Sequence, residues 1–151
     1  MLRWVQAWTR NRENALTQLQ IVVPEGYEVQ YEQWRLAPAL RVGETIYCSG
    51  QLGIGQDGNL PTDAEAQFVN AFEAVRIVLE AAGSSLADIV EMTSFHVGLV
   101  AELETFTRVR DRYLTEPWPA QTAIGVAELG LPGALLEIKA TAVLGVGQAS
   151  S

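Results

Sequence analysis

The carboxylate with the clearest capacity for chemistry is Glu137, which stands in the middle of a predicted strand. It follows two leucines and shares a strand face with Lys139 and Thr141. Partial desolvation beside apolar neighbours raises a carboxyl pKa toward the pH at which a general base works. Solvent exposure at a sheet edge explains the same residue without chemistry. Both roles stay open for Glu137.

The single histidine and single cysteine, His96 and Cys48, are the other candidate reactive groups. Composition alone leaves a Cys–His or Ser–His pair open, the serine being Ser49. No acidic residue that would orient the histidine stands near either one, so the sequence favours structural roles for both. One histidine and one cysteine cannot form a Cys/His zinc site, so neither a metal nor a cofactor is predicted.

The segment from Gly53 to Gly58 matches the pattern G-x-G-x-x-G after a strand, which marks a dinucleotide site when a helix opens at its third glycine. Four residues separate that glycine from the next predicted helix. Asp63 and Glu65 in the first turn of that helix repel a phosphate. We interpret the segment as a turn.

Three arginines fall on one predicted helix but do not form one patch. Arg108 and Arg112 share a face, where Glu104 and Arg108 form an attractive i, i+4 pair, so this is an ordinary solvated surface. Arg110 points about 160° away, toward the apolar side of the helix. It is a candidate for an interface or a pocket.

The clearest of the elements that position these residues is a helix predicted over residues 63–82. Thr62 and Glu65 match a capping box at its start, and Gly83 stands where a C-terminal cap belongs. Its apolar residues recur at spacings of four and three, and they are Phe68, Phe72, Val75, Leu79 and Ala82.

Residues 1–20 predict an amphipathic helix, because Trp4, Trp8, Ala15 and Leu19 recur at helical intervals. Its apolar stripe needs a partner in its own domain or in a neighbouring subunit; a targeting peptide is the alternative.

The remaining elements complete the predicted order of an N-terminal helix followed by β-β-α-β-α-β-β. This order predicts an α+β fold in which a sheet is layered on two helices packed on one face. Apolar residues on the other face of the sheet require a partner surface that buries them, which predicts oligomerisation. In chain order the elements are a hairpin within 36–51 turning at Gly43-Glu44, a loop over 50–60, a strand over 89–97 covered on both faces, a helix over 102–114, and strands over 121–129 and 135–144 joined across Gly130–Gly133.

The 151 residues carry a net charge of -8, of which the first twenty contribute +2 and the remainder therefore -10. This acidic body argues against nucleic-acid binding, which depends on lysine and arginine. No apolar run approaches the roughly 18 residues of a membrane span, and Arg10 and Arg12 interrupt any signal-peptide core. The lone cysteine agrees with a reducing compartment. We therefore expect a soluble cytoplasmic protein without a membrane partner.

Three separated motifs resemble the Rid family, also called YjgF-like or perchloric-acid-soluble-protein-like. They are residues 41–51 (RVGETIYCSGQ), residues 81–83 (AAG) together with residues 86–90 (LADIV), and Trp118-Pro119-Ala120 together with residues 136–140 (LEIKA). The resemblance spans about residues 36–144. It divides the chain into an N-terminal, partly helical extension over 1–33, a Rid-like domain over 34–146 and a tail over 147–151.

The resemblance implies a chorismate-mutase-like fold with a mixed sheet, a homotrimer, and small-molecule pockets at the subunit boundaries. Enzymes of the family hydrolyse reactive enamines and imines derived from amino acids, releasing ammonia and a 2-keto acid. The family's water-positioning glutamate matches Glu137, and its Ser-Gly-Gln backbone segment matches Ser49, Gly50 and Gln51.

Two family residues are replaced in this chain. The arginine that clamps the substrate carboxylate after Pro-Ala is Gln121, and Leu36 stands near the place of the family tyrosine. A charge-assisted arginine contact is worth about 1–2 kcal/mol more than a neutral amide contact, which is roughly five- to thirtyfold in affinity. Arg110 is a candidate replacement cation.

The resemblance therefore implies a homotrimeric, deaminase-like hydrolase with altered substrate preference, in which Glu137 is the base and Gln121, Ser49, Gly50, Gln51, Arg110 and Leu36 contact the substrate. The first alternative is a non-catalytic, metabolite-binding regulatory trimer. The second is an endoribonuclease or translation inhibitor, which the net charge of -8 disfavours. The sequence identifies no ligand.

Overall fold

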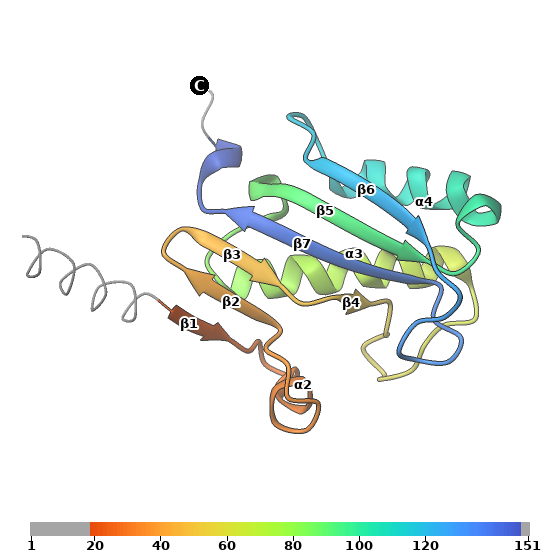
Figure 1. The fold of residues 1–151 in the computed structure, drawn as a ribbon, viewed down its shortest axis with the longest axis horizontal. Helices are drawn as coiled ribbons and strands as arrows, with labels where there is room; N and C mark the ends of the chain where they lie inside the picture. Colours follow the sequence, from red (N-terminus) through yellow and green to blue (C-terminus); the bar gives the residue numbers. More distant parts are fainter. Residues whose placement is uncertain (1–18, 149–151) are drawn as a thin grey trace, which may run out of the picture.

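The computed structural model describes residues 19–148, which form one mixed sheet with two long helices on one of its faces (Figure 1). The strand order is β1-β2-β3-β7-β5-β6, and the short β4 pairs with the same edge of β7 as β3 does. β5 and β6 are parallel and the other pairs antiparallel. The predicted α+β class is confirmed. The elements are β1 (Leu19–Val22), α2 (Glu28–Glu32), β2 (Ala39–Val42), β3 (Thr45–Cys48), β4 (Gln51–Leu52), α3 (Ala64–Ala81), η1 (Leu86–Asp88), β5 (Ile89–His96), α4 (Leu99–Tyr113), β6 (Ala120–Gly125), β7 (Leu136–Val143) and η2 (Val146–Gln148).

Helix α3 forms where the apolar periodicity predicts it and supplies much of the core. Its apolar face, including Phe68 and Phe72, is fully buried against the sheet and α4. The predicted capping box is wrong in its first residue, because Asp63, and not Thr62, caps the helix by accepting a hydrogen bond from the Ala66 N–H at 2.8 Å. The helix starts one residue later as a result.

Gln67, on the buried side of α3, ties the helix to the loop before β7. Its side-chain amide donates to the carbonyls of Pro61 at 2.7 Å and Gly133 at 3.0 Å, and its Oε1 accepts the Leu135 N–H at 2.9 Å. All three polar positions of this buried amide are therefore used.

The predicted hairpin within residues 36–51 is confirmed as β2 and β3, and the positive φ of Gly43, 61°, allows its tight turn. The predicted N-terminal helix falls on residues 1–18, outside the described residues, and its last two positions, Leu19 and Gln20, begin β1 instead.

The second half of the chain differs from the prediction in the bounds of its elements and in the coverage of β5. β6 and β7 are not neighbours, because β5 lies between them and pairs with both. β6 ends at Gly125, and α4 begins at Leu99, three residues earlier than predicted. β5 is not covered on both faces: Met92, Ser94 and His96 are buried under the helices, whereas Glu91 is exposed.

The sheet face away from α3 and α4 is left without a covering layer in the described chain, and we name it the open face (Figure 1). Strand register assigns it the residues that alternate with the buried ones. Several are large, apolar and about half exposed, such as Leu19 at 53%, Ile21 at 51% and Tyr47 at 51%. The open face consists of Leu19, Ile21, Leu40, Val42, Thr45, Tyr47, Leu52, Glu91, Thr93, Phe95, Ala120, Thr122, Ile124, Glu137, Lys139, Thr141 and Val143.

Candidate functional site

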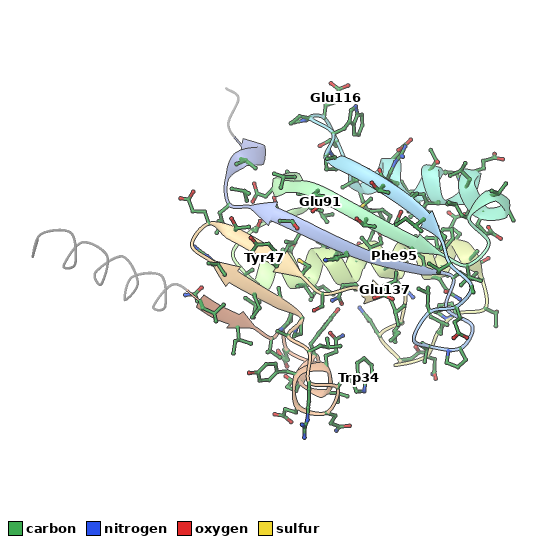
Figure 2. The ribbon with its side chains drawn as sticks, viewed as in Figure 1. Trp34, Tyr47, Glu91, Phe95, Glu116 and Glu137 are labelled. Atoms are coloured by element: carbon green, nitrogen blue, oxygen red, sulfur yellow. The ribbon has the colours of Figure 1, made fainter. Side chains whose placement is uncertain are left out.

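Glu137 lies on the open face within a row of apolar side chains. In register it stands between Leu52 of β4 and Phe95 of β5, and Phe95 stands beside Ile124 of β6. Figure 2 shows Phe95 and Glu137 on neighbouring strands. Burial among these groups raises the pKa of the Glu137 carboxyl above its ordinary value. Among residues 19–148, no hydrogen bond or ion pair engages this carboxylate, so it is free to accept a proton from a bound molecule.

Gly50 is the residue that lets the Glu137 carboxylate take its position. A Cβ on Gly50 would lie 1.8 Å from Glu137 Oε1 and 2.7 Å from its Cδ. The turn that presents Gly50 is fixed on its N-terminal side, because Ser49 donates its hydroxyl to the Ala37 carbonyl at 2.6 Å and its N–H to the Pro38 carbonyl at 3.0 Å. A side chain at position 50 would compete directly with the carboxylate.

The other residues of the predicted Ser-Gly-Gln segment have structural partners. The Ser49 hydroxyl is occupied by its bond to Ala37. Gln51 is buried, pairs with Ile138 on the helix side and donates its amide to the Ser49 carbonyl at 3.0 Å. Only the backbone of this segment is therefore available to the Glu137 side of the open face.

Gln121 does not meet Glu137 within one chain. It stands beside Met92 in the parallel β5–β6 register, and Met92 is buried under the helices. Register partners point to the same side of a sheet, so Gln121 faces the helix side, whereas Glu137 stands beside Phe95 on the open face. A site that contains both side chains needs a second copy of the chain.

Arg110 lies on the same side of the sheet as Gln121. The Leu99 side chain, at the start of α4, lies 3.7 Å from the position of a Cβ on Gly125, at the end of β6. Arg110 comes about three turns and 16 Å later on nearly the same helix face, and Gln121 lies about 13 Å back along β6. Both residues thus stand near the start of β6, where Arg110 pairs with Asp111 at 2.8 Å.

Leu36 and Trp34 precede the Ala37 carbonyl that Ser49 binds, so they belong to the segment beside the Ser49–Gly50 turn. Both are exposed, Trp34 at 55%, and Figure 2 shows Trp34 below the strand that carries Glu137. Neither Trp34 nor Phe95 was among the site residues predicted from the sequence. Phe95 stands in a run of apolar and β-prone residues that does not show which face of the strand is covered, so the sequence held no signal for its place on the open face.

His96 and Cys48 are core residues, as the sequence favoured. Both are buried on the helix side, in strands that are not neighbours. His96 Nε2 lies 2.8 Å from Ser94 Oγ, and its ring packs edge-on against Phe68 and Phe106. Burial raises the pKa of the Cys48 thiol to about 12, so this thiol stays protonated and unreactive. Within the part of the chain that the structure describes, no group of three or more metal-ligating side chains occurs.

Burial of His96 predicts a pH-dependent stability. Burial lowers the pKa of this imidazole in the folded state, so the unfolded chain binds more protons below pH about 6.5. The free energy of unfolding is therefore expected to fall by up to about 1.4 kcal/mol between pH 7.5 and 5.5. Urea unfolding at several pH values measures this. His96→Phe should remove the histidine's contribution to this dependence, and an equal slope in that variant would contradict the prediction.

The remaining candidates have structural explanations. The segment from Gly53 to Gly58 is a turn, closed by a hydrogen bond from the Gly55 N–H to the Asn59 carbonyl at 2.8 Å, as predicted. Glu104 attracts Arg108 through its charge, as predicted, but the hydrogen-bonded partner of Arg108 is Glu65 at 2.8 Å, and Arg112 binds the other oxygen of Glu65. Glu65 is thus an exposed link between α3 and α4, where ion pairs contribute little.

A shallow hollow of about 710 Å³ lies between β1 and the end of α3, away from Glu137. Its cation, Arg41, already donates to the carbonyls of Ala82 at 3.2 Å and Gly43 at 2.9 Å. No carboxylate or nucleophile lines it, so Glu137 and its neighbours remain the better candidate. None of the described helices is long and apolar enough to cross a membrane.

Comparison with known proteins gives a consistent set of relatives. The family described as Endoribonuclease L-PSP matches residues 31–144. RutC family protein YjgH of Escherichia coli K12 is 34% identical over 122 residues, which cover 80% of this chain and 92% of that protein. A 2-iminobutanoate/2-iminopropanoate deaminase of Dermatophagoides farinae is 33% identical over 113 residues, covering 70% of this chain and 83% of that protein. A solved structure of protein YJGH superposes with a TM-score of 0.76 at 33% identity, covering 84% of this chain and 97% of that chain.

Proposed function

Because this chain belongs to the endoribonuclease L-PSP family, the family of YjgF-like and Rid proteins, we propose that it hydrolyses reactive imines or enamines in a pocket containing Glu137. The observation that carries the proposal is the half-buried Glu137 carboxylate, which has a raised pKa and no partner among the described residues. A relative that is 33% identical bears the name of a 2-imino acid deaminase.

In the proposed reaction Glu137 takes a proton from water as the water oxygen attacks the sp² carbon of an imine. Glu137 returns this proton to the nitrogen, which gives a carbinolamine. The hydroxyl proton of the carbinolamine then passes through Glu137 to the amino nitrogen as the carbon–nitrogen bond breaks, so that ammonia and a carbonyl product leave and the carboxylate is restored. A general base works best when its pKa lies near the working pH, which partial burial of Glu137 favours. The Gly50 N–H lies at the turn beside the carboxylate. We propose that it donates a hydrogen bond to the negative charge that develops on the substrate nitrogen during the attack.

We propose that the pocket lies between copies of the chain, in a homotrimer. Gln121 faces the helix side of its own sheet, so its amide reaches a Glu137 site only from a neighbouring copy. The half-exposed apolar residues of the open face supply a surface that association would bury, among them Leu19, Ile21 and Tyr47. Light scattering on the purified protein is expected to give three times the chain mass.

The substrate preference is proposed to differ from that of arginine-bearing relatives. Gln121 offers a neutral amide where they hold a carboxylate with arginine, which weakens that contact roughly five- to thirtyfold. Arg110, near the start of β6 on the same side as Gln121, is a proposed second contact, although it first has to leave Asp111. The lone, buried Cys48 fits a reducing compartment, and we propose the cytoplasm.

Ammonia release from freshly generated 2-imino acids tests the function. The protein is expected to accelerate release over the spontaneous rate, with a higher KM than an arginine-bearing relative. Activity equal to that of such a relative would contradict the altered contact. Ligand stabilisation without turnover, unchanged in Glu137→Gln, would favour the alternative of a metabolite-binding regulatory trimer. RNA cleavage that survives repurification would favour the ribonuclease alternative, which the net charge of -8 opposes.

A further inference from the structure

Lys139 is the only lysine of the chain and stands beside the candidate base. It lies on β7 two residues after Glu137, so both side chains point to the open face, about 6.6 Å apart along the strand. Its register partner on β5 is Thr93. One residue before the β4–β7 pairs, Gly50 comes level with Lys139, and the Glu137 carboxylate lies against Gly50. The carboxylate therefore leans toward the level of the lysine.

The positive charge of Lys139 has no partner within the described chain. No carboxylate of residues 19–148 lies within 4.0 Å of its ammonium group, and Glu91 is bonded to Thr141 at 3.4 Å. The arginines that form ion pairs, which are Arg76, Arg108, Arg110 and Arg112, lie on the helices, and Arg41 faces the helix side of β2. Lys139 is thus the only cation among the strand residues assigned to the open face.

A lone cation on a face that becomes covered needs a counter-charge, because an unpaired buried charge is strongly unfavourable. A ligand carboxylate that enters beside Glu137 meets the opposite difficulty, since two carboxylates repel each other. Contact between Lys139 and the ligand carboxylate removes both difficulties, because the ligand supplies the counter-charge of the lysine and the lysine offsets the repulsion from Glu137. Its flexible stem carries three N–H donors and can follow a small ligand.

We propose that Lys139 binds the carboxylate of the ligand at the Glu137 site, so that the pocket accepts 2-imino and 2-keto acids from the side of β7. This inference rests on the proposed function for the location of the pocket. The cation that binds the ligand carboxylate is thus not at position 121, where relatives have arginine, but at position 139 on β7, the strand that also carries Glu137. The pocket therefore keeps a preference for anions, in a different orientation.

Binding of a stable product analogue tests the inference apart from turnover. Calorimetric titration of the full chain with 2-oxobutanoate is expected to show a Kd that Lys139→Gln raises roughly five- to thirtyfold. Lys139→Arg should restore most of the affinity. The neutral 2-oxobutanamide should bind Lys139→Gln and the unaltered protein equally. Arg76→Gln is the matched control, since it removes one positive charge from α3 and should leave the Kd unchanged.

Three outcomes overturn the inference. One is an unchanged Kd for 2-oxobutanoate in Lys139→Gln, or no binding of this anion by the unaltered protein. Another is a loss of affinity in Arg110→Gln and not in Lys139→Gln. The third is dissociation of the assembly by Lys139→Gln, seen by light scattering, which assigns the lysine to a neighbouring copy's carboxylate. Lysine-dependent binding without ammonia release would reject the hydrolase and keep the inference.

Discussion

Replacing Glu137 by glutamine is expected to lower kcat/KM for imine hydrolysis by about 10²- to 10⁴-fold, the usual contribution of a positioned general base. Glutamine keeps the size of the side chain and removes its capacity to take a proton. Glu137 has no partner among residues 19–148 whose loss would disturb the fold, so the unfolding transition should change little. Ammonia release under single-turnover conditions measures the effect.

The matched control is Glu91→Gln, which removes a carboxylate from the same open face, where Glu91 stands beside Thr141 on β7. It should retain near-normal activity. The rate of the unaltered protein should also rise with pH through a value above the ordinary pKa of a glutamate carboxyl, because burial raises the pKa of Glu137. Equal losses in the two variants would argue for a general electrostatic effect and against a base at position 137.

Alanine at position 50 is expected to cost about 100-fold in activity while the chain still folds. A Cβ there would overlap the Glu137 carboxylate, at 1.8 Å from Oε1, so the carboxylate has to move by more than 1 Å. Misplacement of a reacting group on this scale costs roughly 10²-fold. The atoms that the Cβ would meet belong to the flexible Glu137 side chain and not to the backbone, so this side chain can move aside with little loss of stability.

Gly130→Ala controls for the loss of a glycine, because nothing lies within 4 Å of a Cβ at that position. Both variants should unfold at temperatures near that of the unaltered protein, measured by circular dichroism. Normal activity in Gly50→Ala would show that the carboxylate works from another rotamer, and the geometry proposed for the site would then be wrong.

The local elements of the fold were accessible from the sequence. Apolar residues at spacings of three and four predict helix α3, and the glycine at its turn predicts the β2–β3 hairpin. The residue that caps α3 could not be predicted from the sequence, because Thr62 and Asp63 are adjacent and both have side chains that can cap a helix. Only the backbone direction at the helix start decides between them.

The site was accessible only in part, because it depends on which strands become neighbours. Glu137 was identified from its place in a strand, and the resemblance pointed to the segment with Gly50. That Gln121 and Glu137 lie on opposite faces follows from β5 standing between β6 and β7, which is a pairing of distant segments. No local periodicity carries that information. Phe95 was hidden for the same reason, since an apolar run does not state which face is covered.

The Gln67 amide, joined to Pro61, Gly133 and Leu135, also sets the starting point of β7. Side chains alternate along a strand, so a slip of β7 by a single residue would turn Glu137 under the helices and Leu136 outward. The hydrogen bonds of Gln67 thus hold the register of β7 that places Glu137 on the open face, although Gln67 itself lies on the helix side. A substitution at Gln67 that lets β7 slip would therefore lower activity without touching the site.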